Sequence, residues 1–280
     1  MKNKIILVIS CVLLFIFFYP LFFLIVGSIM GKYEIYKNLE PMFNVGTEKF
    51  ISWSIFPKNL SIQAYVELLL DTPEFFLVFW NSTKIVFITI FGQLIVSVPA
   101  AWGLSIYQYK IKNLILAIYI VLMMIPFMVI MIPQYLILNK FALLDSLWAI
   151  IVPGIFSTLP VFIIYTFFSK IPKTVIEAAR VDGANELQIF LKIGIPLGYP
   201  GIVATILLSF IEYWNVIEQP LIFLRNQKLT TLTLYLPNIS LDNIRVTLVA
   251  SVITLVPSVI LFVVGQSYLE NGIASIVIKE

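Results

Sequence analysis

The sequence predicts an all-α membrane protein with six transmembrane helices, and three observations lead to this prediction. Of its 280 residues, 60% are hydrophobic and 12% are charged, with a mean hydropathy of +1.01, far outside the composition of soluble domains. Apolar runs that reach the length needed to cross a bilayer, about 20 residues, recur along the chain. The charged residues gather between these runs. We therefore expect residues 1–280 to form a single membrane domain.

The composition also excludes several kinds of chemistry. The 18 basic and 15 acidic residues give a net charge of +3 without any basic run, which argues against nucleic acid as a partner. Cys11 is the only cysteine and the sequence has no histidine, so a disulfide within the chain is excluded and the commonest general base is missing. The phosphate-binding pattern G-x-x-x-x-G-K-S/T does not occur. We expect neither an enzyme nor a cofactor bound by this chain.

The first predicted span covers residues 5–29, which carry no charge. Lys2 and Lys4 precede it, so a secretory signal peptide is the alternative. The apolar run is longer than the core of a signal peptide, and no small-x-small cleavage site follows it. We therefore predict an uncleaved transmembrane helix.

A charged loop of about 45 residues follows from Met30 to Glu74. Short surface helices are expected in it around Trp53–Pro57 and Tyr65–Leu70, and Asp71-Thr72-Pro73 has the residue types of a helix N-terminus. The other five spans are predicted at residues 78–107, 113–136, 147–169, 198–219 and 246–269.

Two features of these spans bear on their geometry. The third span contains Pro126 and Pro133, and proline bends a helix because it removes a backbone hydrogen bond. Lys84 interrupts the second span close to one end, where its long side chain can reach the membrane surface. Six spans leave both ends of the chain on one side. Lysine and arginine occur at higher density in the loops of that side, which places the termini in the cytoplasm.

The most polar stretch inside the apolar region is residues 170–197, between the fourth and fifth spans. Pro172 suits the first turn of a helix, and Gly183 suits the left-handed turn that ends one. Between them, four residues share a shallow helix face: Val175, Ala178, Ala179 and Asp182. Asn185 is expected to cap a second short helix, whose apolar stripe would rest on the membrane surface or on the ends of the spans. That stripe consists of Leu187, Phe190, Leu191 and Gly194.

The residues leave two roles open for this segment. Its first helix could dock in a groove of another protein, with Glu177, Arg180 and Asp182 making polar contacts around the shallow face. It could equally be an amphipathic connector on the membrane surface, with Glu177 and Arg180 paired across one turn.

The stretch EAARVDGANELQIFLKIGIP resembles the EAA loop of permease subunits of binding-protein-dependent ABC importers. The positions that match are Glu177, Ala178, Ala179, Asp182, Gly183 and Pro196. Four further segments, in the same order along the chain, are similar to the carbohydrate-type permeases and specifically to the maltose-type second permease subunit. They are WNSTKIVFITIFGQLIVSVPAAWGLS, MMIPFMVIMIPQYLILNKFALLDSLWAIIVP, EYWNVIEQPLIFL and VPSVILFVVGQSYLENGIASIVIKE. The resemblance runs from Phe79 to Glu280, with a permease core at about residues 75–275.

Two departures from the family pattern stand out. Thr83 and Lys84 follow Asn81-Ser82, where the family has leucine. The tail reads Gly272-Ile273-Ala274-Ser275 in place of the family's ending, so the contact with the ATPase that this ending implies is in doubt.

The resemblance implies a function and a set of partners. The EAA helix would be a cytoplasmic coupling helix that docks on an ATPase, and Arg180 would belong to that docking set. Two ATPase subunits would bind ATP and magnesium. A second permease would form a heterodimer with this chain in the bacterial inner membrane, among its lipids, and an extracellular solute-binding protein would deliver a sugar or oligosaccharide. The alternatives are another solute, such as glycerol phosphate or a polyol, or an ion-coupled secondary transporter.

Polar residues in or near the spans are the candidates for lining the solute path, because sugars need hydrogen bonds and aromatic faces. They are Asn81, Ser82, Gln93, Glu212, Tyr213, Asn215 and Gln219. The competing role for each is a hydrogen bond between helices. Glu212 and Glu218, both in the fifth, are the only acidic residues inside the predicted spans, and a secondary transporter would require more such residues.

Overall fold

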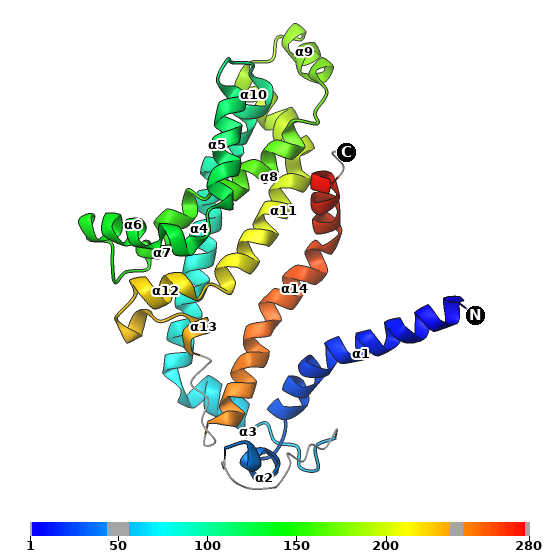
Figure 1. Cartoon of the computed structure of the whole chain (residues 1–280), viewed down its shortest axis with the longest axis vertical. Helices are drawn as coiled ribbons and strands as arrows, with labels where there is room; N and C mark the ends of the chain where they lie inside the picture. The colour runs from blue at the N-terminus through cyan, green and yellow to red at the C-terminus, as the bar shows by residue number, and fades with distance from the viewer. Residues whose placement is uncertain (1, 44–55, 236–242, 278–280) are drawn as a thin grey trace. The chain divides into compact units, whose positions relative to one another are not determined.

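The computed structural model describes residues 2–43, 56–235 and 243–277, and most of these residues are helical (Figure 1). Within these ranges the only β-type pairing is an isolated bridge between Met30 and Leu60. The prediction of an all-α protein is confirmed. The chain forms two compact units, residues 1–78 with 234–258 and residues 79–233 with 259–280. The expectation of one membrane domain stays a prediction.

The first unit begins with α1 (Lys2–Ser28) and α2 (Lys32–Phe43). It continues with α3 (Gln63–Val66) and the π-helical turn η1 (Glu67–Asp71), and includes the first turns of α4 (Pro73–Ile106) and of α14 (Ile244–Val277). Its core joins α1 and α2 to α14 through Val26, Met30, Ile35, Leu39, Ile244 and Leu248.

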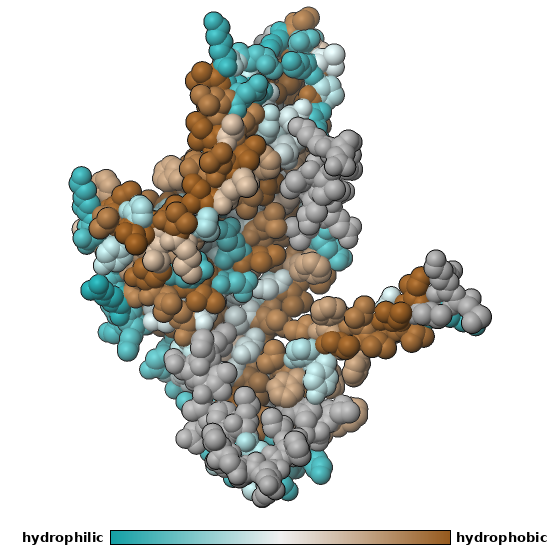
Figure 2. Space-filling view, viewed as in Figure 1, coloured by the Kyte–Doolittle hydropathy of each residue, from teal (hydrophilic) through white to brown (hydrophobic). Residues whose placement is uncertain are grey.

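Helix α1 is apolar on all sides, and most of its side chains are exposed. Figure 2 shows hydrophobic residues along nearly its whole length, and Phe15 and Phe17 are 69% and 74% exposed. A helix that is apolar all round needs lipid or another helix as its surroundings. This agrees with the predicted first span at residues 5–29.

The long loop after α1 is partly as predicted. The helix expected around Tyr65–Leu70 is present as α3 and η1, and α4 begins at Pro73. Helix α2 was not predicted, because Pro41 and several charged residues hide its periodicity. The helix expected around Trp53–Pro57 falls mostly outside the described residues.

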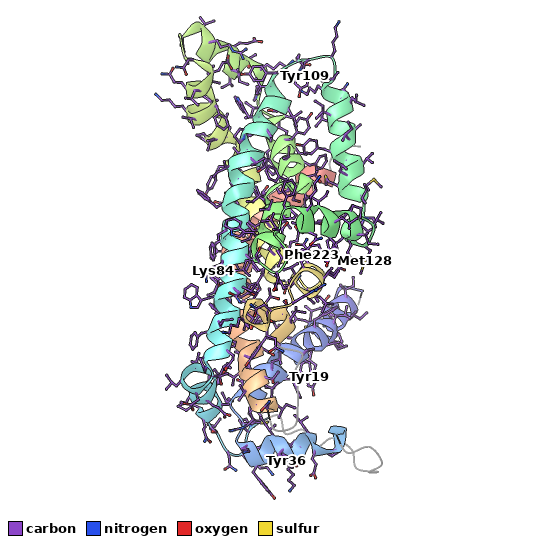
Figure 3. The ribbon with its side chains drawn as sticks, turned by 90° about the vertical axis from the view of Figure 1, so that its left-hand side faces the viewer. Tyr19, Tyr36, Lys84, Tyr109, Met128 and Phe223 are labelled. Atoms are coloured by element: carbon purple, nitrogen blue, oxygen red, sulfur yellow. The ribbon has the colours of Figure 1, made fainter. Side chains whose placement is uncertain are left out.

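The second unit contains the rest of α4 and α14 and the elements between them. These are α5 (Lys112–Met124), α6 (Phe127–Lys140), α7 (Trp148–Ile155), α8 (Thr158–Phe168), α9 (Lys173–Val181), α10 (Glu186–Ile189), η2 (Phe190–Gly194), α11 (Ile195–Trp214), α12 (Glu218–Phe223) and η3 (Gln227–Leu229), with α13 (Leu232–Tyr235) at its border. Lys84 lies exposed on the surface of α4 (Figure 3), and its reach to the membrane surface stays a prediction.

The third predicted span, residues 113–136, is not one straight helix. Helices α5 and α6 meet at an angle of 99° (Figure 3). The break lies at Ile125 and Pro126, which both have extended backbone angles. Proline pushes the residue before it out of the helical region and has no amide hydrogen to continue the helix. The six-span prediction therefore holds if this bent pair is counted as one span, and five helices remain otherwise.

The other spans are present with shifted ends. Helices α7 and α8 together form the fourth span, and the sixth covers Ile244–Tyr268 of α14, whose helix continues to Val277. The fifth span begins earlier than predicted, at Glu186, and its helix ends at Trp214. Gln219, which was predicted to lie in that span, therefore belongs to the separate helix α12.

Candidate coupling loop and polar cavity

The turn after α9 has the geometry that the sequence predicted. Gly183 has a φ of +83°, in the left-handed region that favours glycine. Its amide donates to the carbonyl of Arg180 at 3.1 Å, and the amide of Ala184 donates to the carbonyl of Ala179 at 3.0 Å. These two bonds form a Schellman motif, which satisfies the last carbonyls of the helix.

One side of α9 packs against the core, and the other side is exposed. Ile176 is 3% exposed and packs in the core formed by α4, α8 and α10, which includes Trp102 and Phe168. Ala179 is half-buried beside this core. The other members of the predicted shallow face, Val175, Ala178 and Asp182, are exposed. The helix therefore presents a small-residue surface on a firmly seated element.

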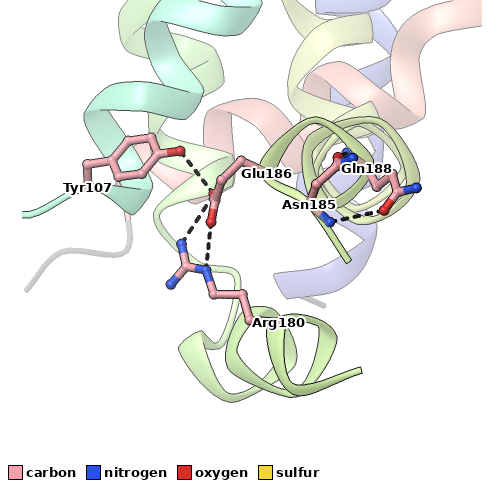
Figure 4. Close-up of polar contacts among 5 residues, drawn as sticks. All are labelled: Tyr107, Arg180, Asn185, Glu186 and Gln188. Carbon is pink, nitrogen blue, oxygen red and sulfur yellow. Dashed lines mark hydrogen bonds and ion pairs between the residues drawn. The ribbon is translucent and has the colours of Figure 1, made fainter. Parts of the chain in front are cut away.

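A carboxylate ties this helix to its neighbours. Arg180 Nε donates to Glu186 Oε1 at 2.8 Å, and the hydroxyl of Tyr107 donates to Glu186 Oε2 at 2.9 Å (Figure 4). Glu186 thus joins α9, α10 and the residue that follows α4. The partner of Arg180 is Glu186 and not Glu177, so the ion pair expected for a simple surface connector is not formed. Glu177 and Arg180 instead line a pocket of about 340 Å³.

The second helix of the loop begins as predicted. The side chain of Asn185 accepts from the amide of Gln188 at 2.8 Å, and the side chain of Gln188 accepts from the amide of Asn185 at 3.0 Å (Figure 4). This reciprocal pair is a capping box. Asn185 is therefore confirmed as the cap.

The apolar stripe predicted for this helix is divided between the core and the surface. The ring of Phe190 is tilted against that of Trp102, with ring centroids 5.7 Å apart, and Gly194 is buried. Leu187 and Leu191 are exposed, whereas Ile189 is fully buried. Ile189 belongs to the same core as Trp102 and Ile176, and the positions of those residues cannot be inferred from helical periodicity alone. Pro196 lies exposed in the first turn of α11, which directly follows η2.

Three helix breaks surround a cavity of about 450 Å³ in the second unit. The breaks lie between α5 and α6, between α7 and α8, and between α11 and α12. Its lining includes polar residues from α6, the start of α8, α11 and α12: Gln134, Ser157, Thr158, Glu212, Tyr213 and Gln219. Backbone groups that lose their hydrogen bonds at a helix break are tolerated in a membrane where they are buried in protein or line a water-filled cavity. This arrangement suits a place where polar solutes contact the protein.

Four of the predicted pathway residues lie at or next to this cavity. Glu212, Tyr213 and Gln219 line it. Gln93 is 1% exposed and donates from Nε2 to the carbonyl of Gly154, which also lines the cavity, at 2.9 Å.

The other three predicted pathway residues make hydrogen bonds elsewhere. Asn81 donates to the carbonyls of Lys228 and Thr230 at 2.8 and 3.2 Å, and Ser82 accepts from the amide of Leu232 at 2.9 Å. Asn215 donates back to the carbonyl of Ile211, in the last turn of α11. Asn81 and Ser82 thus hold the segment that follows α12, and a contact of these residues with solute stays a prediction.

The sequence did not single out Gln134, Ser157 and Thr158. Each is polar within an apolar run and stands next to or near a proline, Pro133 or Pro160. Polar residues beside helix-breaking prolines are the signal that would have found them.

The long apolar helices, the breaks around a polar cavity and the separately anchored polar helix together define a multi-pass membrane protein of the permease class. Residues 93–275 match the family described as "Binding-protein-dependent transport system inner membrane component", and the chain belongs to this family. The resemblance found from the motifs is confirmed. The family match does not test the roles of individual residues in the loop or the cavity, which stay predictions.

Several characterised proteins are similar to the chain. It is 29% identical to the arabinooligosaccharides transport system permease protein AraQ of Halalkalibacterium halodurans, over 92% of this chain and 90% of that protein. It is 28% identical to the lactose transport system permease protein LacG of Rhizobium radiobacter, over 70% and 73%. A solved bacterial ABC transporter involved in the import of the acidic polysaccharide alginate has a chain with a TM-score of 0.78 at 24% identity, covering 96% of this chain and 98% of that one. At this identity the likeness shows the fold alone.

Proposed function

We propose that the chain is one permease subunit of an ATP-binding-cassette importer and carries a sugar or oligosaccharide across the membrane. Membership of the inner membrane component family, shown by the match over residues 93–275, is the observation that carries this proposal. The relatives named for arabinooligosaccharides and lactose support a carbohydrate as the solute. The cavity with its amide, hydroxyl and aromatic side chains has the chemistry to contact such a solute.

The chain works with several partners in this proposal. A second permease completes the translocation path as a heterodimer, and an extracellular solute-binding protein delivers the sugar. Two ATPase subunits bind ATP and magnesium and carry out the hydrolysis, since this sequence lacks the phosphate-binding pattern and binds no cofactor itself. The assembly lies in the lipid of the bacterial cytoplasmic membrane, with both termini of the chain in the cytoplasm.

Helix α9 is the point at which the ATPase acts. Its exposed residues Glu177, Ala178 and Asp182 form the docking surface, and the small side chain of Ala178 allows a close approach. Closure of the ATPase dimer then displaces α9. Because Ile176 is packed against α4 and α8, the displacement reaches the spans and favours one of the two states of the path.

Reversal of one charge on α9 tests this role. We expect Glu177→Arg to weaken co-purification of the ATPase subunits and to abolish ATP-dependent uptake in vesicles. Glu74→Arg is the control, since Glu74 is also an exposed acid, in the first turn of α4 and outside both the coupling loop and the cavity lining. If Glu177→Arg retains both association and uptake, the docking surface has been placed wrongly.

The alternative is an ion-coupled secondary transporter. An acidic side chain in the cavity would fit this alternative, because such transporters bind their ions near the middle of the membrane. The two mechanisms differ in their energy source. Uptake that survives a proton uncoupler while ATP is held constant supports the importer, and uptake that collapses supports the secondary transporter.

A further inference from the structure

We infer that the cavity between the three helix breaks is a solute subsite for an uncharged polyhydroxylated compound, and that Glu212 makes it reject anionic sugars. This inference rests on the proposed function and deepens it, since family membership leaves the charge of the solute open. It also separates two of the alternatives raised by the sequence, because a polyol is accepted and glycerol phosphate is not.

The hydrogen-bonding groups of the cavity match a sugar. Gln134 on α6, together with Ser157 and Thr158 at the start of α8, supplies donors and acceptors. Gln219 adds an amide group from α12 to the same lining. The cavity therefore carries neutral hydrogen-bonding side chains on α6, α8 and α12.

The apolar part of the lining also fits a sugar ring. Phe127, Phe156 and Tyr213 line the same cavity, and aromatic faces contact the C–H surfaces of a pyranose or furanose. The volume of about 450 Å³ lies within the usual range of small-molecule sites, roughly 300–1,000 Å³. Shape and polarity thus agree on a small carbohydrate or a short segment of a longer one.

The charge of the lining sets the class of solute. Glu212 is the only charged residue among those described as lining the cavity, and none of them is basic. Recognition of a carboxylate, sulfonate or phosphate requires arginine, lysine or a set of backbone amides. A carboxylate instead accepts hydrogen bonds from neutral hydroxyl groups and repels an anion across the same space. The cavity therefore favours neutral solutes.

Cysteine labelling measures the effect of the Glu212 charge on the electrostatic potential in the cavity. It does not require the natural solute to be known. In a Cys11→Ser background, Gln134→Cys places a thiol in the cavity wall, and Ile62→Cys places one at a 72% exposed site in the first unit. The assembled importer in membrane vesicles is treated with a cationic or an anionic methanethiosulfonate of similar size. We expect the cationic reagent to modify position 134 faster, with a rate ratio at least about threefold above that at position 62.

Glu212→Gln should then abolish this preference at position 134 and leave the ratio at position 62 unchanged. The inference is overturned if position 134 reacts with neither reagent, with or without ATP, since the cavity would then be closed to solutes. It is also overturned if the rate ratio is the same with and without the Glu212 charge.

Protection from labelling tests the solute class directly. Lactitol and lactobionate form a matched pair of probes, because both carry galactose on an open-chain polyhydroxylated unit and they differ by a terminal carboxylate. We expect lactitol at high concentration to slow modification of position 134 and lactobionate to have little effect, with the difference reduced by Glu212→Gln. Equal protection by both, or protection by neither, contradicts the subsite. Labelling does not depend on transport. Absence of ATP-dependent uptake would refute the proposed function, and the uptake assay measures it independently of the labelling assay.

Discussion

Arg180 and Glu186 form an ion pair with Nε and Oε1 2.8 Å apart, and this pair joins the two helices of the charged loop. Both side chains are close to half exposed, at 42% and 48%. Exposed ion pairs add little to stability, because water screens them and the side chains lose freedom. The geometry indicates that the ion pair orients α9 and does not mainly stabilise the fold. Since Glu186 also accepts from Tyr107 after α4, the pair sets the direction in which α9 leaves the spans.

We predict that Glu186→Gln changes coupling more than stability. The melting temperature of the assembled importer should stay nearly constant, while uptake per ATP hydrolysed should fall severalfold. The exchange of both residues, Arg180→Glu with Glu186→Arg, should restore part of the coupling because the pair can form again. The readouts are thermal unfolding, ATP hydrolysis and uptake on one preparation. If the double variant takes up no more solute per ATP hydrolysed than Arg180→Glu alone or Glu186→Arg alone, the pair does not orient α9.

The sequence predicted the parts of the loop in which a residue type has few conformational choices. Gly183 in the left-handed turn and Asn185 at the cap are of this kind, since the backbone geometry and the side-chain bond follow from the residue itself. Which face of α9 is buried could not be predicted from residue types in this way. Val175 and Ile176 are adjacent and both apolar, and only the positions of α4 and α8 decide that Ile176 is the one that packs.

The cavity was predictable to a similar extent. Glu212, Tyr213 and Gln219 attracted attention as polar residues in or near an apolar run, and the structure places all three in its lining. Gln134 was missed because the third span was expected to continue through Pro126. The 99° bend there brings the start of α6 against the cavity, which a local pattern cannot reveal.

Ile176→Ala should release α9 from the core. Ile176 is 3% exposed, and removal of a buried isoleucine side chain costs about 2–5 kcal/mol where the site cannot collapse. We expect proteolysis or hydrogen exchange to increase in α9 while the spans stay protected. Val181→Ala is the control, because Val181 is 87% exposed and its removal leaves no cavity. Equal protection of α9 in the two variants would mean that Ile176 is not its anchor.

Gly194→Ala should destabilise the contact between η2 and α4. A Cβ atom at Gly194 would lie 2.6 Å from Cζ3 of the buried Trp102, closer than any real contact, and the ring is held by Phe168 and Phe190. Overpacking of this kind costs about 1–3 kcal/mol. Gly103→Ala is the matched change in helix α4, where no atom lies within 4 Å of the added Cβ, and it should be neutral or gain up to about 1 kcal/mol. Melting temperatures of the two variants measure the difference, and a similar shift in both would refute the close packing.

The loop between α6 and α7 should respond to acid through Asp145. Its carboxylate accepts from the amide of Asn226 at 2.8 Å and from that of Arg225 at 2.9 Å, and its own amide donates to the carbonyl of Phe223. The hydrogen bonds from Asn226 and then Arg225 hold the pKa of Asp145 below its ordinary value, because they stabilise the charged form. The carboxylate thus clamps the segment after α12.

The sign of the pH effect follows from this lowered pKa. A group with a lower pKa in the folded state stabilises it at every pH above the unfolded value, about 3.9 for aspartate, and this contribution is lost as the pH falls through the folded value. Exchange of the amides of Arg225 and Asn226, corrected for its intrinsic pH dependence, should therefore be steady from about pH 7 to 5 and rise below about pH 4. Asp145→Asn keeps the acceptor oxygen, and asparagine tolerates the φ of +56° at this position. It should weaken the protection at neutral pH and remove the acid response, because no charge remains to titrate. An acid response as large in the variant as in the natural chain would assign the effect to another group.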